Sequence, residues 1–432
     1  MFKNLALFTL LFSGVEFSAH AQRAVLAGTY TLPRTSLSQL GNPACSETAL
    51  AIAKKNGLRL NDMPSIGSGL AKAGENEFFG ITDRGPNYKA GEDDEETARR
   101  IVPLPQFCPT IVRLKLAGKE IRIAQAIPLR DSRGQLISGL SNMKGEEPLY
   151  DSAEAKSPLP FDPNGVDLEG IRVLPDGNFL LCEEYSPSIL VVGTNGQVLM
   201  RYTPISKTPT NATYPVKAIL PDIFSQRRIN KGFENLALSA DGKFAYAILQ
   251  SPMGDVREKH FAQSRVIRVL KLDVSQPLDA KVAGEYLALA SPAGGYSAKT
   301  TQQKISWSDA DWIAPDKLLV LERAKGLAKL LLVDLSGATN ILERKEAATL
   351  TLEETGADLA ALKIQPASAR EIFSTRDVAG IDSDKIEGVA VLSPTEVALA
   401  NDNDFSIGPN QNENSWIWII QLTEPLPVVR QK

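Results

Sequence analysis

Acidic residues recur in a fixed frame along the chain, and side chains of this type are suited to binding a hard cation. Glu169 and Glu234 each stand seven residues before the aspartate of a turn signal, Asp176 and Asp241 respectively. The same frame recurs three more times, at Ser68, Asp309 and Glu387. Fifteen residues after each of the five positions come Asp83, Glu184, Leu249, Ala324 and Asp402, and Glu322 stands two residues before Ala324. The chain therefore carries two sets of regularly spaced carboxylates.

The elements that must position these carboxylates are predicted to be short antiparallel strands. In each repeat an apolar run is followed by a turn signal, a second apolar run, a polar cluster and a third apolar run. Strands and turns that recur without a long amphipathic helix indicate an all-β chain. Repeats of three or four antiparallel strands are typical of propeller blades, and five repeats are visible, so we predict a single β-propeller with five or six blades. Two stacked β-sandwich domains are the alternative architecture.

Two segments bear on how the ring is completed. Residues 27–32 are predicted to add an outer strand to the last blade and so close the ring. The gap between Ser68 and Glu169 is the longest, and it contains the acidic run 92–96 and the segment 131–162. This gap is either a loop insertion or a degraded sixth blade.

Propeller geometry brings the two sets of carboxylates to one mouth of the central channel. The first strand of each blade lines the channel and the second runs antiparallel to it, so the start of one lies beside the end of the other. Like charges this close together need a counterion. Ca²⁺ is the simplest choice because it takes several oxygen ligands, and Mg²⁺ and Mn²⁺ are the alternatives. The predicted metal ligands are Glu169, Glu234, Glu387, Asp402, Asp404 and Asn235.

Basic residues stand next to the acids in the sequence and suit an anionic substrate. Asp83 or Glu184 is predicted to be a general base, and Arg84 and Arg323 are predicted to clamp the substrate. Further substrate contacts are predicted at Lys231, Lys385, Glu322 and Tyr185. For each single acid the alternative is a structural salt bridge to a neighbouring arginine or lysine.

The composition disfavours histidine and serine chemistry. The chain has two histidines, of which His20 lies in the N-terminal leader, so only His260 remains. No His-Glu-x-x-His or Gly-x-Ser-x-Gly motif is present. A histidine-ligated zinc or iron site and a Ser-His-Asp triad are therefore disfavoured. A net charge of only −4 gives no indication of nucleic-acid binding.

The N-terminus predicts export. Residues 1–21 combine a lysine, a short apolar run and a small-x-small cleavage site that ends at Ala21, as in a signal peptide. The apolar run is too short to span a bilayer. The mature chain, residues 22–432, is therefore expected to be one soluble propeller domain, monomeric, in the periplasm or outside the cell.

Export also permits a disulfide bond. Cys45 and Cys108 both stand in loop-like sequence and are the predicted pair, whereas Cys182 lies within an apolar run. Three cysteines allow three pairings, and the sequence does not decide among them.

Several of these motifs together resemble the phytase-like family, which is also described as having esterase-like activity of phytase. The motifs are Asp83-Arg84-Gly85-Pro86-Asn87, Asp167-Leu168-Glu169-Gly170, Glu183-Glu184-Tyr185-Ser186-Pro187, Gly232-Phe233-Glu234-Asn235-Leu236, Lys385-Ile386-Glu387-Gly388 and Asn401-Asp402-Asn403-Asp404-Phe405. The resemblance implies a β-propeller and a secreted phosphoesterase or esterase. In β-propeller phytases, calcium ions and basic residues hold the phosphate while a metal-activated water attacks. The phosphate-binding motifs of those enzymes are not matched residue by residue in this chain.

The leading functional hypothesis is an exported, metal-dependent hydrolase of phosphate monoesters or related esters, in which the metal lowers the pKa of a bound water. A calcium-dependent lactonase or arylesterase is the second hypothesis. The third is a non-catalytic periplasmic binding propeller in which calcium is structural. The expected partner is a small anionic or ester substrate.

Overall fold

The structure is a computed structural model that describes residues 24–40, 45–55, 64–90, 99–407 and 414–428. The predicted signal peptide and the acidic run 92–96 lie outside these residues. Within them the chain is almost entirely β, as predicted, and its α-helices are α1 (Glu47–Lys55) and α2 (Lys259–Ala262). No described helix is long and apolar enough to cross a membrane.

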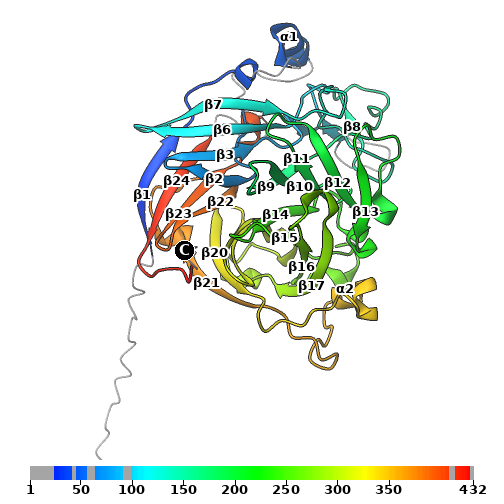
Figure 1. Cartoon of the computed structure of the whole chain (residues 1–432), viewed down its shortest axis with the longest axis vertical. Helices are drawn as coiled ribbons and strands as arrows, with labels where there is room; N and C mark the ends of the chain where they lie inside the picture. Colours follow the sequence, from blue (N-terminus) through cyan, green and yellow to red (C-terminus); the bar gives the residue numbers. More distant parts are fainter. Residues whose placement is uncertain (1–23, 41–44, 56–63, 91–98, 408–413, 429–432) are drawn as a thin grey trace, which may run out of the picture.

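Most of the described strands form five four-stranded antiparallel groups (Figure 1). The first group is β2 (Leu70–Gly74), β3 (Glu77–Ile81), β6 (Thr110–Ala117) and β7 (Glu120–Pro128), and the second is β9 (Leu168–Val173), β10 (Phe179–Glu183), β11 (Ser188–Val192) and β12 (Val198–Pro204). The third is β14 (Phe233–Leu238), β15 (Phe244–Leu249), β16 (Val266–Asp273) and β17 (Lys281–Leu289), and the fourth is β18 (Ser306–Ala314), β19 (Lys317–Ala324), β20 (Leu327–Asp334) and β21 (Ser368–Ser374). The fifth is β22 (Ile386–Ser393), β23 (Glu396–Asn401), β24 (Trp416–Leu422) and β1 (Ala24–Thr31).

The first strands of these groups form a ring. Strands β2, β9, β14, β18 and β22 contact one another in cyclic order, so that β22 also contacts β2. The N-terminal strand β1 pairs antiparallel with β24 along its length, next to it in Figure 1, which confirms the predicted closure by the N-terminal segment. A single parallel pair, Thr31 with Glu120, joins the fifth group to the first and merges them into one eight-stranded sheet. The arrangement is therefore propeller-like.

The long gap before Glu169 contributes a small sheet rather than another four-stranded group. This sheet contains β4 (Tyr88–Ala90), β5 (Arg99–Ile101) and β8 (Leu149–Tyr150). A further strand, β13 (Val216–Leu220), extends the second group by pairing parallel with β12. The described 3-10 turns are η1 (Leu37–Leu40), η3 (Ile205–Lys207), η4 (Asp222–Gln226), η5 (Pro277–Asp279), η6 (Ala293–Gly295), η7 (Gln302–Lys304), η8 (Lys345–Ala348), η9 (Leu350–Leu352), η10 (Thr375–Asp377) and η11 (Asp404–Ser406).

Local sequence explains the inner hairpins. Strand β10 is buried at every position, because it packs on both faces, and it is a continuous apolar run up to its last residue. The turn before it needs a positive φ, which Gly177 supplies at 87°. Asp176 Oδ1 accepts a hydrogen bond from the Asn178 backbone N–H at 3.0 Å, as expected of a turn aspartate. Between neighbouring groups the apolar side chains interdigitate, for example Leu180 with Leu236 in one core cluster.

Candidate metal and substrate site

A polar cavity of about 270 Å³ lies where the first strands begin and the second strands end. It brings together most of the residues that the sequence selected: Asp83, Arg84, Glu169, Glu184, Lys231, Glu234, Arg323, Lys385, Glu387 and Asp404. It is also lined by Asn87, Arg100, Asn230 and Gln250, which the sequence did not select. Members of both predicted tiers therefore line one cavity, whereas Asp309, Glu322 and Asp402 do not line it.

A β-bulge at the start of the first strand presents each glutamate. In the second group Leu168 pairs with Glu183 and Gly170 pairs with Cys182, so Glu169 is the extra residue between them. The register shifts in the same way around Glu234 and around Glu387. Bulges redirect a side chain and are common next to functional sites.

A close backbone contact brings the two tiers together. Gly232 packs against the end of the preceding group so tightly that a methyl group at this position would lie 2.3 Å from the carbonyl oxygen of Glu184. Glycine is thus required two residues before Glu234. The contact sets Glu234 and Glu184, which come from different groups, against the same cavity.

We call Asp167, Glu169, Glu184 and Glu234 the open carboxylate group. Asp167, Glu169 and Glu184 each offer an oxygen atom, and these three atoms lie within 4.8 Å of one another. All four residues are buried. Arg84 pairs with Asp167, and its Nη2 atom lies 3.2 Å from Glu184 Oε2. Among the described residues, the side-chain carboxylates of Glu169 and Glu234 form no hydrogen bond or ion pair. In the same part of the chain, Glu184 Oε1 is buried without a hydrogen-bond partner.

Burial and mutual repulsion govern the ionisation of this group. Burial, together with the charges of Asp167 and Glu234, raises the pKa of Glu169 well above its ordinary value. Burial, together with Glu387 and Glu184, does the same to the pKa of Glu234, against the opposing effect of Lys231. Burial and Asp167 raise the pKa of Glu184 to about 7 although Arg84 and Lys231 lower it. A bound cation would relieve this repulsion.

We call Lys385, Glu387, Asp402 and Asp404 the lysine-centred group. Lys385 Nζ forms an ion pair with Asp402, lies 2.6 Å from Asp404 Oδ1 and lies 3.4 Å from Glu387 Oε2. Arg323 also pairs with Glu387, and its Nε donates to Ser308 Oγ at 2.8 Å. Burial raises the pKa of Glu387 to about 7. The pKa of Asp402 is about 2, because Lys385 and further hydrogen bonds outweigh the effect of burial.

A loop at the rim holds Arg84 in place. Glu147, which the sequence did not select, lies 3.2 Å from both Arg84 Nη1 and Arg100 Nε. The ring of Tyr185 lies 5.0 Å from the Arg84 guanidinium carbon, and its hydroxyl donates to the Gly139 carbonyl at 3.0 Å. Tyr185, predicted to contact substrate, is therefore buried beneath Arg84 and does not line the cavity.

Asn235 also lies away from the cavity. Its Nδ2 donates to the Trp307 carbonyl at 2.7 Å, while its Oδ1 is buried without a partner among the described residues. Its predicted role as a metal ligand has no support from this position. Asp83 does line the cavity, and burial, with the charges of Asp402 and Asp167, raises its pKa well above the ordinary value.

In the fourth repeat the observed strand register differs by one residue from the predicted repeat frame. Trp307 pairs with Glu322 and Asp309 pairs with Leu321, so Ser308, not Asp309, occupies the bulge position. Glu322 accordingly matches Glu183 in register, and Arg323 matches Glu184. In the third repeat the same register places Gln250, instead of the predicted Leu249, at the position that matches Glu184.

The displaced acids have structural partners. Glu322 is fully buried and accepts hydrogen bonds from Trp307 Nε1 at 2.7 Å and from the Tyr296 hydroxyl at 2.8 Å, so it does not reach the substrate cavity as predicted. Asp309 lies 3.2 Å from Arg172 Nη2 and accepts from the Val389 backbone N–H at 2.9 Å. Both residues therefore fit the structural alternative.

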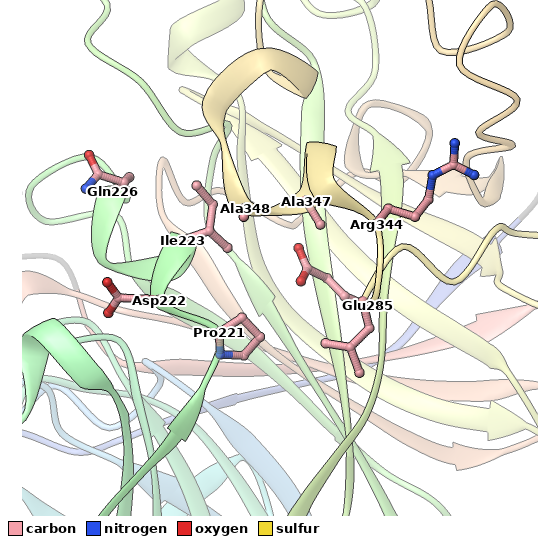
Figure 2. Close-up of a pocket in the computed structure, with 9 residues that line it drawn as sticks. Pro221, Asp222, Ile223, Gln226, Glu285, Arg344, Ala347 and Ala348 are labelled. Carbon is pink, nitrogen blue, oxygen red and sulfur yellow. The ribbon is translucent and has the colours of Figure 1, made fainter.

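A separate cavity of about 220 Å³ lies between η4 and η8 (Figure 2). Figure 2 shows Glu285 projecting from its strand toward Ala347 and Ala348, with Asp222 on the opposite wall. The Glu285 carboxylate lies 2.6 Å from Arg268, which also pairs with the buried Glu353. The carboxylate of Glu285 in this second cavity is thus neutralised by a structural ion pair, unlike the carboxylates of Glu169 and Glu234.

The cysteines are buried. Cys45 is a free thiol, and burial raises the pKa of both Cys45 and Cys108 to about 12. The structure thus has no disulfide at Cys45, and the Cys45–Cys108 pairing stays a prediction that the mass of the non-reduced protein would check.

An all-β ring with an acidic cavity at one mouth is the class of protein that these observations define. Residues 66–405 match the phytase-like family, described as "Esterase-like activity of phytase". The chain therefore belongs to this family, as its motifs had indicated.

Individual relatives are distant. An uncharacterized secreted protein of Arthroderma benhamiae is 27% identical over 124 residues, which cover 26% of this chain and 24% of that protein. A calcium-binding protein of Agrobacterium tumefaciens, regucalcin, is 12% identical with a TM-score of 0.34, covering 86% of this chain and 96% of that one. The periplasmic gluconolactonase of Pseudomonas aeruginosa is 10% identical with a TM-score of 0.31, covering 84% of this chain and 87% of that one.

Proposed function

We propose that the mature chain, residues 22–432, is one five-bladed propeller exported by a signal peptide cleaved after Ala21. The cyclic contacts of the five first strands and the pairing of β1 with β24 support a single closed ring. The secreted relative supports a location in the periplasm or outside the cell.

We further propose that the protein is a metal-dependent hydrolase of phosphate monoesters or related esters. The observation that carries this proposal is the open carboxylate group. Oxygen atoms of Asp167, Glu169 and Glu184 lie within 4.8 Å of one another, and Glu234 lines the same cavity. Glu169 and Glu234 are buried and have no ion pair among the described residues. Clustered buried carboxylates without a cation are unfavourable, and their oxygen atoms suit Ca²⁺ best, with Mg²⁺ and Mn²⁺ as alternatives. The open carboxylate group would hold the ion, and the ion would supply Lewis-acid polarisation and an activated water.

The residues across the cavity are suited to the remaining tasks. Arg323 and Lys231 would hold the anionic part of the substrate, because both basic side chains line the same cavity as Glu169. Asp83 is favoured over Glu184 as the general base, because Glu184 belongs to the set of candidate ligands. The raised pKa of Asp83 makes it a stronger proton acceptor than an ordinary aspartate, which suits a general base.

Metal content and turnover, measured together, test this function. The purified protein is stripped with a chelator, reloaded with Ca²⁺ and assayed for phosphate release from a panel of phosphomonoesters and for hydrolysis of lactones and aryl esters. We expect phosphate release that disappears on chelation and returns with Ca²⁺. Glu120→Gln, at an exposed position on β7, serves as the matched control and should retain activity.

The other results separate the alternatives. Calcium-dependent turnover confined to lactones or aryl esters would overturn the phosphoester assignment in favour of a lactonase. A calcium-dependent gain in thermal stability without turnover on either panel would favour a binding protein with structural calcium. Full turnover after removal of all metal would contradict the role of the open carboxylate group.

A further inference from the structure

The second cluster of acids in the cavity already contains a cation. An ammonium group has three N–H donors and no acceptor. Around Lys385 Nζ stand three carboxylates, those of Asp402, Asp404 and Glu387, the last at 3.4 Å. The Lys385 side chain is 25% exposed, whereas those of Asp402 and Glu387 are 2% and 4% exposed. Each donor can therefore be directed at a different carboxylate, of which those of Asp402 and Glu387 are largely buried and that of Asp404 is 30% exposed.

The turn that supplies two of these carboxylates is fixed in an uncommon conformation. Asp404, Phe405 and Ser406 have φ angles of 47°, 53° and 56°, in the left-handed region that non-glycine residues seldom adopt. The turn is held by the fully buried Phe405, whose ring packs edge-on against Phe107 with 5.3 Å between centroids.

Hydrogen bonds hold the same turn from within. Asp402 Oδ1 accepts from the Asp404 backbone N–H at 2.8 Å, and Asn403 Oδ1 accepts from the Phe405 backbone N–H at 3.0 Å. The Lys385 carbonyl accepts from the Asp402 backbone N–H at 3.0 Å, which ties the lysine strand to the turn. Strained backbone of this kind persists where the surroundings enforce it and is concentrated at functional sites. The carboxylates are thus held in place around the ammonium group.

We propose that Lys385 is a built-in cation that occupies the position of a second metal ion, so that the cavity binds a single metal, at the open carboxylate group. This inference rests on the proposed function for the first ion. The two groups face one cavity, and a divalent ion beside the Lys385 ammonium would meet a like charge within a few ångströms. Removing the ammonium would take the Lys385 charge away from Asp402 and Asp404, while Arg323 would still pair with Glu387, and carboxylate oxygen atoms are the ligands that a hard cation prefers.

Calcium stoichiometry tests this role directly. Wild-type protein, Lys385→Ala and Lys385→Arg are stripped of metal and titrated with Ca²⁺ by calorimetry, and the bound metal is counted by elemental analysis after gel filtration. We expect one ion per chain in wild type, two in Lys385→Ala and one in Lys385→Arg, which keeps the positive charge. The thermal midpoint of Lys385→Ala should rise with Ca²⁺ more than that of wild type, because the second ion replaces the missing ammonium group.

Each result has a distinct meaning. Wild-type protein that binds no calcium would overturn the proposed function itself, whereas wild-type protein that binds two ions would overturn only the role of Lys385. One ion in a folded Lys385→Ala would also overturn that role. If Lys385→Ala is unfolded without calcium, Lys385→Gln, which keeps hydrogen-bond donors without charge, replaces it and is expected to bind two ions.

Discussion

The two carboxylate groups of the cavity come from the same repeat frame yet differ in what neutralises them. In the lysine-centred group, Asp402, Asp404 and Glu387 surround an ammonium group of the chain itself. In the open carboxylate group, Arg84 serves Asp167 and Glu184, and among the described residues Glu169 and Glu234 have no ion pair. The difference teaches that the number of acids alone does not locate a candidate metal site. The better indication is a set of buried acids that lack an ion-pair partner.

The largest expected effect separates the two groups by metal affinity. Glu234→Gln removes one charge from the open carboxylate group and should weaken calcium binding by about 100-fold, since ligand charge sets affinity at such sites. Asp404→Asn removes one charge from the lysine-centred group and should change calcium affinity by less than about threefold. Calorimetric titration of the two variants measures both values.

Equal loss of affinity in the two variants would break the comparison, because it would mean that both groups bind the same ion. Glu120→Gln, on an exposed strand of the first group, is the control for a charge removed far from the cavity. Its calcium affinity should equal that of wild type.

The next effect concerns stability and tests the corrected register. Glu322 accepts three hydrogen bonds, from Trp307, Tyr296 and the Ser291 backbone N–H, and lies outside the cavity. Glu322→Gln should lower the free energy of unfolding by about 1.5–3 kcal/mol, because hydrogen bonds to a buried charged acceptor are lost. Calcium affinity should stay within about twofold of wild type. Urea unfolding and a calcium titration check the two statements, and a loss of calcium affinity at full stability would favour the original frame.

The strand register of the five groups shows which features could be predicted from the sequence and which could not. Strand order, hairpin turns and closure by the N-terminal strand follow from local apolar runs and turn residues, and they were predicted. Glu169, Glu234 and Glu387 were found because each bulge lies at the same distance from its turn. The fourth repeat has a second irregularity between Trp312 and Ala314, as the fifth has between Val391 and Ser393. Ser308 stands seven residues before Pro315, as Glu387 does before Pro394, so aligning the fourth repeat on Asp316 moved the predicted position to Asp309.

Ion pairs between residues far apart in the chain could not be predicted from the sequence. Arg84 meets Asp167 from 83 residues away, and Arg323 meets Glu387 from 64 residues away. Such contacts decide which acids are neutralised, and no local pattern encodes them. Asp167 itself had a usable signal, because it precedes Glu169 by two residues, the spacing that keeps side chains on one face of a strand. Glu147 and Asn230 lie in irregular segments, where no spacing pattern in the sequence could have identified them.

The smallest expected effect is a pH dependence of stability, in which Glu184, Glu169 and Glu387 act with one sign and Asp402 with the opposite sign. In metal-free protein the pKa of Glu184 is about 7, against an ordinary value of 4.5, and that of Glu169 is also raised. Between pH 4.5 and about pH 7 these carboxyl groups keep a proton in the folded state that the unfolded chain has released. The free energy of unfolding therefore falls as the pH rises through this range. For Asp402, whose pKa is about 2, the contribution is present above 3.8 and is lost only as the pH falls toward 2.

Thermal unfolding in chelator and in excess Ca²⁺, from pH 5 to pH 8, measures this dependence. The metal-free midpoint should fall with rising pH by about 2–4 °C, the shift that corresponds to about 1 kcal/mol in a mid-sized domain. The midpoint with calcium should stay nearly constant, because the bound ion stabilises the ionised carboxylates. The gap between the two curves should therefore widen toward pH 8. A constant gap would mean that calcium binds away from the buried acids of the cavity, since their ionisation would couple metal binding to pH in this range.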